Sequence, residues 1–204
     1  MDYIQVLEAQ DAEEAIELLK SVVTLSSKED GSPDVALLKQ SDYVVAPVMH
    51  KGTLTPAILE RFYAAAKTTG HSEMTAVGLY SAEEQHCYRV PMSLEALSEL
   101  RGTSCGVVNF VLFAGAPDWL IVFDDQLYIA YGPASFVTAL VDDIEGAYKA
   151  VESRLNELYN ESQADIPSYA VQEINRMGEY LDSALEKLSK QYPNATEGAM
   201  VSVV

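Results

Sequence analysis

Acidic side chains are the residues of this sequence whose types and spacing could most readily do chemistry. Between Gly102 and Tyr148 the chain has no lysine or arginine, yet it carries six acids: Asp118, Asp124, Asp125, Asp142, Asp143 and Glu145. Paired aspartates can hold a hard cation, but Ca²⁺ takes about six to eight oxygen ligands, and no D-x-D-x-D-G loop occurs. We therefore expect no metal site. These acids, with Tyr148 beside them, instead predict a surface that binds a basic protein.

A plainer interpretation of the same residues stays open. Asp124-Asp125 joins two apolar runs and is typical of a solvated turn, and Asp142-Asp143 could lie on the outward side of a helix. In that case the acids only keep the protein in solution. Charge by itself bears on solubility and association and does not specify a fold.

The histidine best placed for function is His50. It follows an apolar run and precedes Thr55-Pro56, a typical helix start whose free amides can bind an anion. A small ligand pocket formed by His50, Thr53 and Thr55 is therefore a second hypothesis. The alternative is that His50 is a solvent-exposed loop residue.

The two cysteines, Cys87 and Cys105, are too few for a disulfide-bonded scaffold or a cysteine-rich zinc site. Each adjoins an apolar or extended segment, so we expect buried, unreactive thiols and no catalytic residue among them. The phosphate-binding patterns G-x-x-x-x-G-K and G-x-G-x-x-G are absent, as is the hydrolase pattern G-x-S-x-G. We expect no cofactor and a cytoplasmic protein with reduced cysteines.

The charge of the whole chain supports the interaction hypothesis. Its 204 residues include 13 Lys and Arg against 31 Asp and Glu, a formal net charge of −18. Nucleic acids and anionic membranes are bound largely through Lys and Arg, so we expect neither as a partner. Such a field does attract basic proteins, because long-range electrostatics raise association rates.

The elements that must position these residues are predicted from periodicity and capping signals. A helix is predicted from Asp11, as its N-cap, to Leu25, and another from Thr55-Pro56 to Gly70. The remaining predictions for the first hundred residues are strands at 3–7, 43–48, 74–80 and 87–90, a helical turn at 34–39 and a helix at 93–100.

Three apolar runs give the strongest strand signal. They span 107–113, 119–123 and 127–131 and are joined by connections too short for a parallel crossover, so they should form an antiparallel meander. The run from Cys105 to Phe123 is long enough for a membrane span, but Pro117-Asp118 interrupts it with a turn signal. We expect a hairpin from Asp118 to Gly132 with its turn at Asp124-Asp125.

The C-terminal third is predicted to be helical. Apolar residues recur at spacings of three and four from Val137 to Leu158 and again from Ala170 to Leu188, with a polar turn between. This pattern is typical of a helical hairpin or of helices that pair between chains.

The sequence thus predicts an α+β fold with a mixed sheet. The sheet centres on a three-stranded meander at about 107–131, and a helical hairpin at about 134–191 packs on one face. Residues 1–192 should form one domain and 193–204 a tail. The leading function is a non-enzymatic acidic protein, of the immunity-protein, nucleic-acid-mimic or adaptor type, that binds a basic protein and could inhibit it. The alternatives are a small enzyme or ligand-binding domain at His50, and a structural subunit that forms homodimers through its C-terminal helices.

Overall fold

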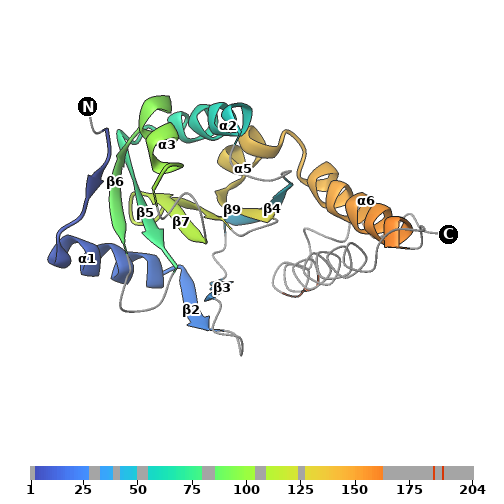
Figure 1. Cartoon of the computed structure of the whole chain (residues 1–204), viewed down its shortest axis with the longest axis horizontal. Coiled ribbons are helices and arrows are strands. Elements are labelled where there is room, and N and C mark those ends of the chain that lie inside the picture. The colour runs from blue at the N-terminus through green and yellow to red at the C-terminus, as the bar shows by residue number, and fades with distance from the viewer. Residues whose placement is uncertain are drawn as a thin grey trace.

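Figure 1 shows the computed structural model of the chain. It describes residues 3–27, 33–38, 42–49, 55–79, 86–103, 109–123 and 127–162, together with Glu186 and Lys190. In chain order the elements are β1 (Gln5–Val6), α1 (Ala9–Lys20), β2 (Val23–Ser27), β3 (Pro33–Leu37), β4 (Tyr43–Met49), α2 (Pro56–Lys67), β5 (Glu73–Gly78), β6 (Cys87–Pro91), α3 (Leu94–Leu100), β7 (Phe110–Ala114), β8 (Trp119–Phe123), β9 (Leu127–Pro133), α5 (Ala134–Val141) and α6 (Ile144–Ser162).

The α+β class is confirmed, and the main sheet has seven strands in the order β1-β6-β5-β7-β8-β9-β4. The predicted meander lies within it as β7, β8 and β9, which pair in sequence as antiparallel neighbours. The prediction of a mixed sheet is wrong, because every strand pair in the described part of the chain is antiparallel. Residues 107–108 and the expected turn at Asp124-Asp125 lie outside the described residues.

Helices cover both faces of this sheet (Figure 1), which explains why the central strands are apolar at every position. Helices α2, α3 and α5 pack on one face, together with Phe110 and Leu112 of β7. Helix α1, the β2–β3 ribbon and the beginning of α6 pack on the other, together with Val111 and Phe113. Alternate side chains of one strand therefore enter two separate cores.

The capping signals for α2 and α3 are confirmed. The Thr55 hydroxyl accepts a hydrogen bond from the Ile58 amide, and Pro56 is the first residue of α2. The Ser93 hydroxyl accepts from the Ala96 amide at the start of α3. Both signals act within one helical turn, so they do not depend on the rest of the fold.

The predictions for residues 11–25 and 34–39 are partly wrong. Helix α1 begins at Ala9, Asp11 lies in its first turn, and the helix ends at Lys20 rather than Leu25. Residues 23–27 form β2 and pair with β3, which occupies most of the expected helical turn at 34–39. Valine and threonine at 22–24 favour strands, and a strand partner ten residues away outweighs the helical spacing.

The predicted C-terminal hairpin is corrected in its first arm. The seam from Val137 to Leu158 is divided into α5 and α6 at Asp142, which has a φ of 64°. The Asp143 amide donates to the Val141 carbonyl at 2.8 Å, which makes a tight γ-turn. Helix α5 packs on one face of the sheet, whereas the beginning of α6 contributes to both cores, with Ala147 on the face of α5 and Tyr148 on the other. The second arm and the tail lie outside the described residues, apart from Glu186 and Lys190, which are helical and ion-paired.

No helix in the described part of the chain combines the length and the apolar character that crossing a membrane requires.

Candidate functional site

Three of the predicted partner-binding acids lie where α5 meets α6, and each has an intramolecular role. The Asp142 carboxylate pairs with the Arg61 guanidinium of α2 at 2.7 Å. The Asp143 carboxylate accepts the Gly146 amide at 3.0 Å and so caps the first turn of α6. Glu145 pairs with Lys149 one turn later. These carboxylates are exposed, but nearby donors already compensate part of their charge.

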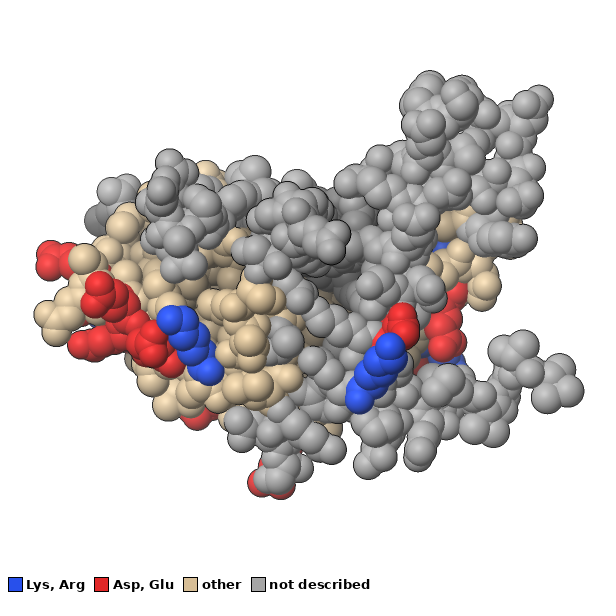
Figure 2. All heavy atoms as spheres, turned by 90° about the horizontal axis from the view of Figure 1, so that it is seen from below, with Lys and Arg blue, Asp and Glu red and all other residues tan. Residues whose placement is uncertain are grey.

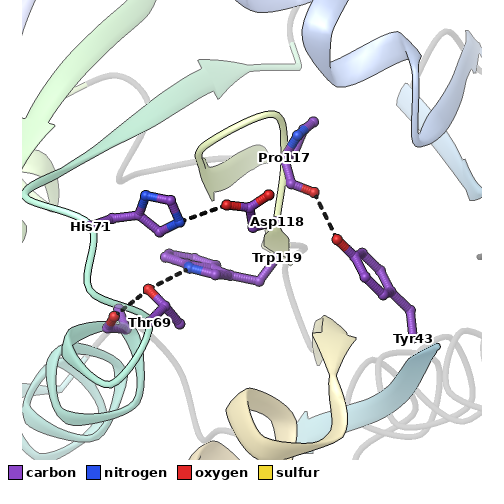
Figure 3. A network of polar contacts seen from close by, with 7 residues as sticks. Tyr43, Thr69, His71, Pro117, Asp118 and Trp119 are labelled. Atoms are coloured by element: carbon purple, nitrogen blue, oxygen red, sulfur yellow. Dashed lines mark hydrogen bonds and ion pairs between the residues drawn. The ribbon is translucent and has the colours of Figure 1, made fainter.

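Asp118 lies in a different place, in the tight turn between β7 and β8. Its carboxylate pairs with His71 Nε2 at 2.8 Å, just beyond the end of α2 (Figure 3). A Cβ on Gly115 would lie 2.4 Å from this carboxylate, and the φ of +66° at Gly115 also favours glycine. The turn therefore has to be built on glycine for Asp118 to reach His71.

Two further hydrogen bonds connect this turn to the rest of the protein (Figure 3). The Trp119 indole donates to the Thr69 hydroxyl at 3.2 Å, and the Tyr43 hydroxyl donates to the Pro117 carbonyl at 3.4 Å. Burial raises the pKa of Tyr43, with smaller contributions from the charges of Asp118 and Tyr131. The His71–Asp118 contact joins this turn to the segment that follows α2.

Tyr148, the aromatic residue predicted to support partner binding, is buried in the structure. It is 1% exposed, its hydroxyl donates to the Val45 carbonyl at 3.4 Å, and burial raises its pKa. Tyr148 therefore holds α6 against β4 and offers no contact surface of its own.

The acids between Gly102 and Tyr148 thus separate into two groups. Asp118 immediately precedes β8, whose partner β9 leads into α5, whereas Asp142 follows the end of α5, and eight residues of helix span about 12 Å. Residues outside this stretch pair with its acids: Arg61 with Asp142, Lys149 with Glu145, and His71, which carries a charge only when protonated, with Asp118. Asp124 and Asp125 lie outside the described residues.

Two of the three residues of the predicted ligand pocket, His50 and Thr53, lie outside the described residues. Thr55 is described, and its hydroxyl is engaged as the N-cap of α2. Cys87 is buried, and desolvation raises the pKa of its thiol to about 11, so the thiol stays protonated near neutral pH. Cys105 is not among the described residues. Within the described part of the chain, no three potential metal-binding side chains gather.

A different surface combines acidic and exposed apolar side chains. We call it the N-terminal surface, and it consists of β1, its flanks and the outward side of α1. Its acids are Glu8, Asp11, Glu13, Glu14 and Glu17. Tyr3, Val6 and Leu18 are 48%, 58% and 44% exposed, and they are among the few large apolar side chains in the described residues that reach solvent.

The two parts of the N-terminal surface lie at the same end of the molecule (Figure 1), with Tyr3 beside Glu99 of α3 on one side of the sheet and α1 packed on the other. Figure 2 shows acidic side chains gathered at this end, over α1. On α1, Glu14, Glu17 and Leu18 are three and four residues apart, so they share one side of the helix. The opposite side carries Ala15 and Leu19 into the core.

Sequence reasoning missed this surface because it followed the apolar seam of the helix. Leu18 lies off that seam, one position before the buried Leu19, and is flanked by glutamates on the helix surface. The sequence therefore contains a signal for the exposure of Leu18. It contains no signal for the exposure of Val6, which depends on β1 being the last strand of the sheet.

No protein-family model matches this chain, and no curated protein or solved structure matches it either.

Proposed function

We propose that this protein is a non-enzymatic interaction protein that binds a basic protein, with the N-terminal surface as its main contact. The observation that carries the proposal is the coincidence, within residues 3–18, of exposed Tyr3, Val6 and Leu18 with five acids. Exposed apolar side chains supply contact area, and a surrounding field of one sign steers an oppositely charged partner. The net charge of −18 supports a basic partner over an acidic one.

The N-terminal surface suits this role better than the acids at the α5–α6 junction. At the junction, Asp142 and Glu145 pair with Arg61 and Lys149, and Asp143 caps α6. In α1, Asp11 pairs with Arg89 of β6 and Glu17 with Lys20, whereas Glu13 and Glu14 have no basic residue within one turn along the helix. More uncompensated charge is therefore available there.

We place this interaction in the cytoplasm, where a buried, reduced Cys87 would be stable. Inhibition of the partner follows if the contact covers the partner's own functional site. The enzyme and self-assembly alternatives depend on His50, Thr53 and the second C-terminal helix, which lie outside the described residues, and they stay predictions.

The test compares two variants that lose the same charge in different places. The N-terminal variant is Glu13→Gln, Glu14→Gln and Glu17→Gln, and the matched control is Asp142→Asn, Glu145→Gln and Glu157→Gln. A partner is first captured with the unaltered protein, and its association rate is then measured against ionic strength.

We expect the N-terminal variant to associate about three- to tenfold more slowly at low salt, with a flatter salt dependence and a smaller change in dissociation. The control should change the rate by less than about twofold. Equal slowing by both variants would mean that net charge alone acts, and unchanged rates in both would refute the proposal.

A further inference from the structure

Resting on the proposed function, we propose that β1 is an acceptor edge. An extended segment of the basic partner would pair with its outer side and continue the main sheet by one strand. Strand addition of this kind draws affinity from main-chain hydrogen bonds and specificity from alternate side chains.

The direction of the main-chain groups follows from the observed register. Gln5 pairs with Arg89 of β6, and the Leu7 amide donates to the Cys87 carbonyl at 2.8 Å. Gln5 and Leu7 therefore direct their amides and carbonyls toward β6. Because main-chain direction alternates along a strand, those of Ile4 and Val6 point away from the sheet. No strand in the described part of the chain pairs with that side.

The opposite edge of the sheet, β4, is protected by contrast. The Tyr148 hydroxyl of α6 donates to the Val45 carbonyl, and two residues later Pro47 has no amide hydrogen to offer. Proline and covering helices are common means of blocking strand addition at an edge. Among the residues that the structure describes, neither a proline nor a covering helix lies along Ile4 to Val6, where the Val6 side chain is 58% exposed.

The side chains around β1 identify the chemistry of the added segment. Val6 and Tyr3 offer apolar contact beside the edge. Glu8 lies two residues after Val6, the last residue of β1. Before the strand, the Glu99 carboxylate of α3 accepts the Tyr3 amide at 2.6 Å. An extended segment with alternating basic and apolar residues matches both features. Ile4 and Val6 offer four outward main-chain groups, which limits the pairing to a short segment, and charge complementarity adds steering and specificity.

The experiment uses a defined probe, an acetylated and amidated six-residue peptide of alternating lysine and valine, with the full-length protein. Its control is the same peptide with every second amide N-methylated, which keeps the charge but blocks pairing along one edge. Among the protein variants, Val6→Pro removes one outward amide, and Val6→Thr keeps that amide with a side chain of similar shape.

We expect Val6→Thr, which alters the side-chain contact but keeps the outward amide, to bind the peptide somewhat more weakly than the unaltered protein, and Val6→Pro to bind it about tenfold more weakly than Val6→Thr. The N-methylated peptide should bind at least about tenfold more weakly than its parent. Hydrogen exchange at the Ile4 and Val6 amides should slow in the complex, whereas exchange at Gln5 and Leu7 should already be slow without peptide.

The proposal is overturned if the unmodified peptide fails to bind, or if the N-methylated peptide binds as tightly. Equal binding to Val6→Pro and the unaltered protein, with no change in exchange at Ile4 and Val6, would also overturn it. Should Val6→Pro fold poorly, as its Trp119 fluorescence would reveal, the N-methylated peptide still decides. None of these results alters the salt-dependence test on α1, so the proposed function can stand where the strand addition fails.

Discussion

Thr69→Val tests how far the buried indole of Trp119 depends on its hydrogen bond. Trp119 is 1% exposed, its indole nitrogen donates to the Thr69 hydroxyl at 3.2 Å, and that hydroxyl donates to the Ala66 carbonyl at 2.6 Å. Valine keeps the shape of threonine but leaves the indole N–H without its acceptor. An unsatisfied buried donor costs about 1 to 3 kcal/mol, so we expect the free energy of unfolding to fall by that amount.

The assay is urea unfolding followed by tryptophan fluorescence, and Trp119 is the only tryptophan in the sequence, so the signal reports this site. With an m-value of about 2 kcal/mol per M, the unfolding midpoint should fall by about 0.5 to 1.5 M with an unchanged slope. The control is Thr69→Ser, which keeps the hydroxyl and should lose less than Thr69→Val. A Thr69→Val protein with the midpoint and emission maximum of the unaltered protein would refute the reasoning.

Two further predictions concern pH and backbone geometry. Burial raises the pKa of Cys87 from 9.0 to about 11 and that of Tyr128 from 10.0 to about 12. As the pH rises, the unfolded chain loses these protons before the folded chain does, so the free energy of unfolding should fall between about pH 9 and about pH 12. In urea titrations, Cys87→Ala should make the first part of that fall less steep. Gly115→Ala places a Cβ 2.4 Å from the Asp118 carboxylate at a φ of +66°, whereas Gly70 has a φ of +80° and open space. Thermal unfolding should show a loss of about 2 to 3 kcal/mol for Gly115→Ala and only about 1 kcal/mol for Gly70→Ala, and equal losses would contradict the packing argument.

Part of this fold could be predicted from the sequence because its signals act over a few residues. Thr55-Pro56 and Ser93 cap their helices through hydrogen bonds within one turn. The short connections after Ala114 and Phe123 force antiparallel neighbours whatever surrounds them, and β7, β8 and β9 pair as expected. The apolar character of β7 and β8 also indicated two covered faces, which the two cores confirm.

The elements that were mispredicted depend on contacts distant in sequence. Val22 and Val23 are compatible with both a helical seam and a strand. Pairing with β3, which ends at Leu37, leaves Val22 in the turn before β2 and makes Val23 the first residue of β2. The seam through Asp142 is continuous in sequence, yet the chain turns there, because Tyr148 of α6 enters the core opposite to that of α5 and Arg61 of α2 holds the Asp142 side chain.

The candidate site shows the same division. The sequence establishes the number of acids and the absence of bases between Gly102 and Tyr148, because both are properties of composition. Only the folded chain brings His71 to Asp118 and Arg61 to Asp142, and the Arg61 guanidinium compensates one of the charges that this stretch would offer to a partner. Only the strand order makes β1 an edge and leaves Val6 exposed, because an edge is a property of the whole sheet and no local pattern encodes it.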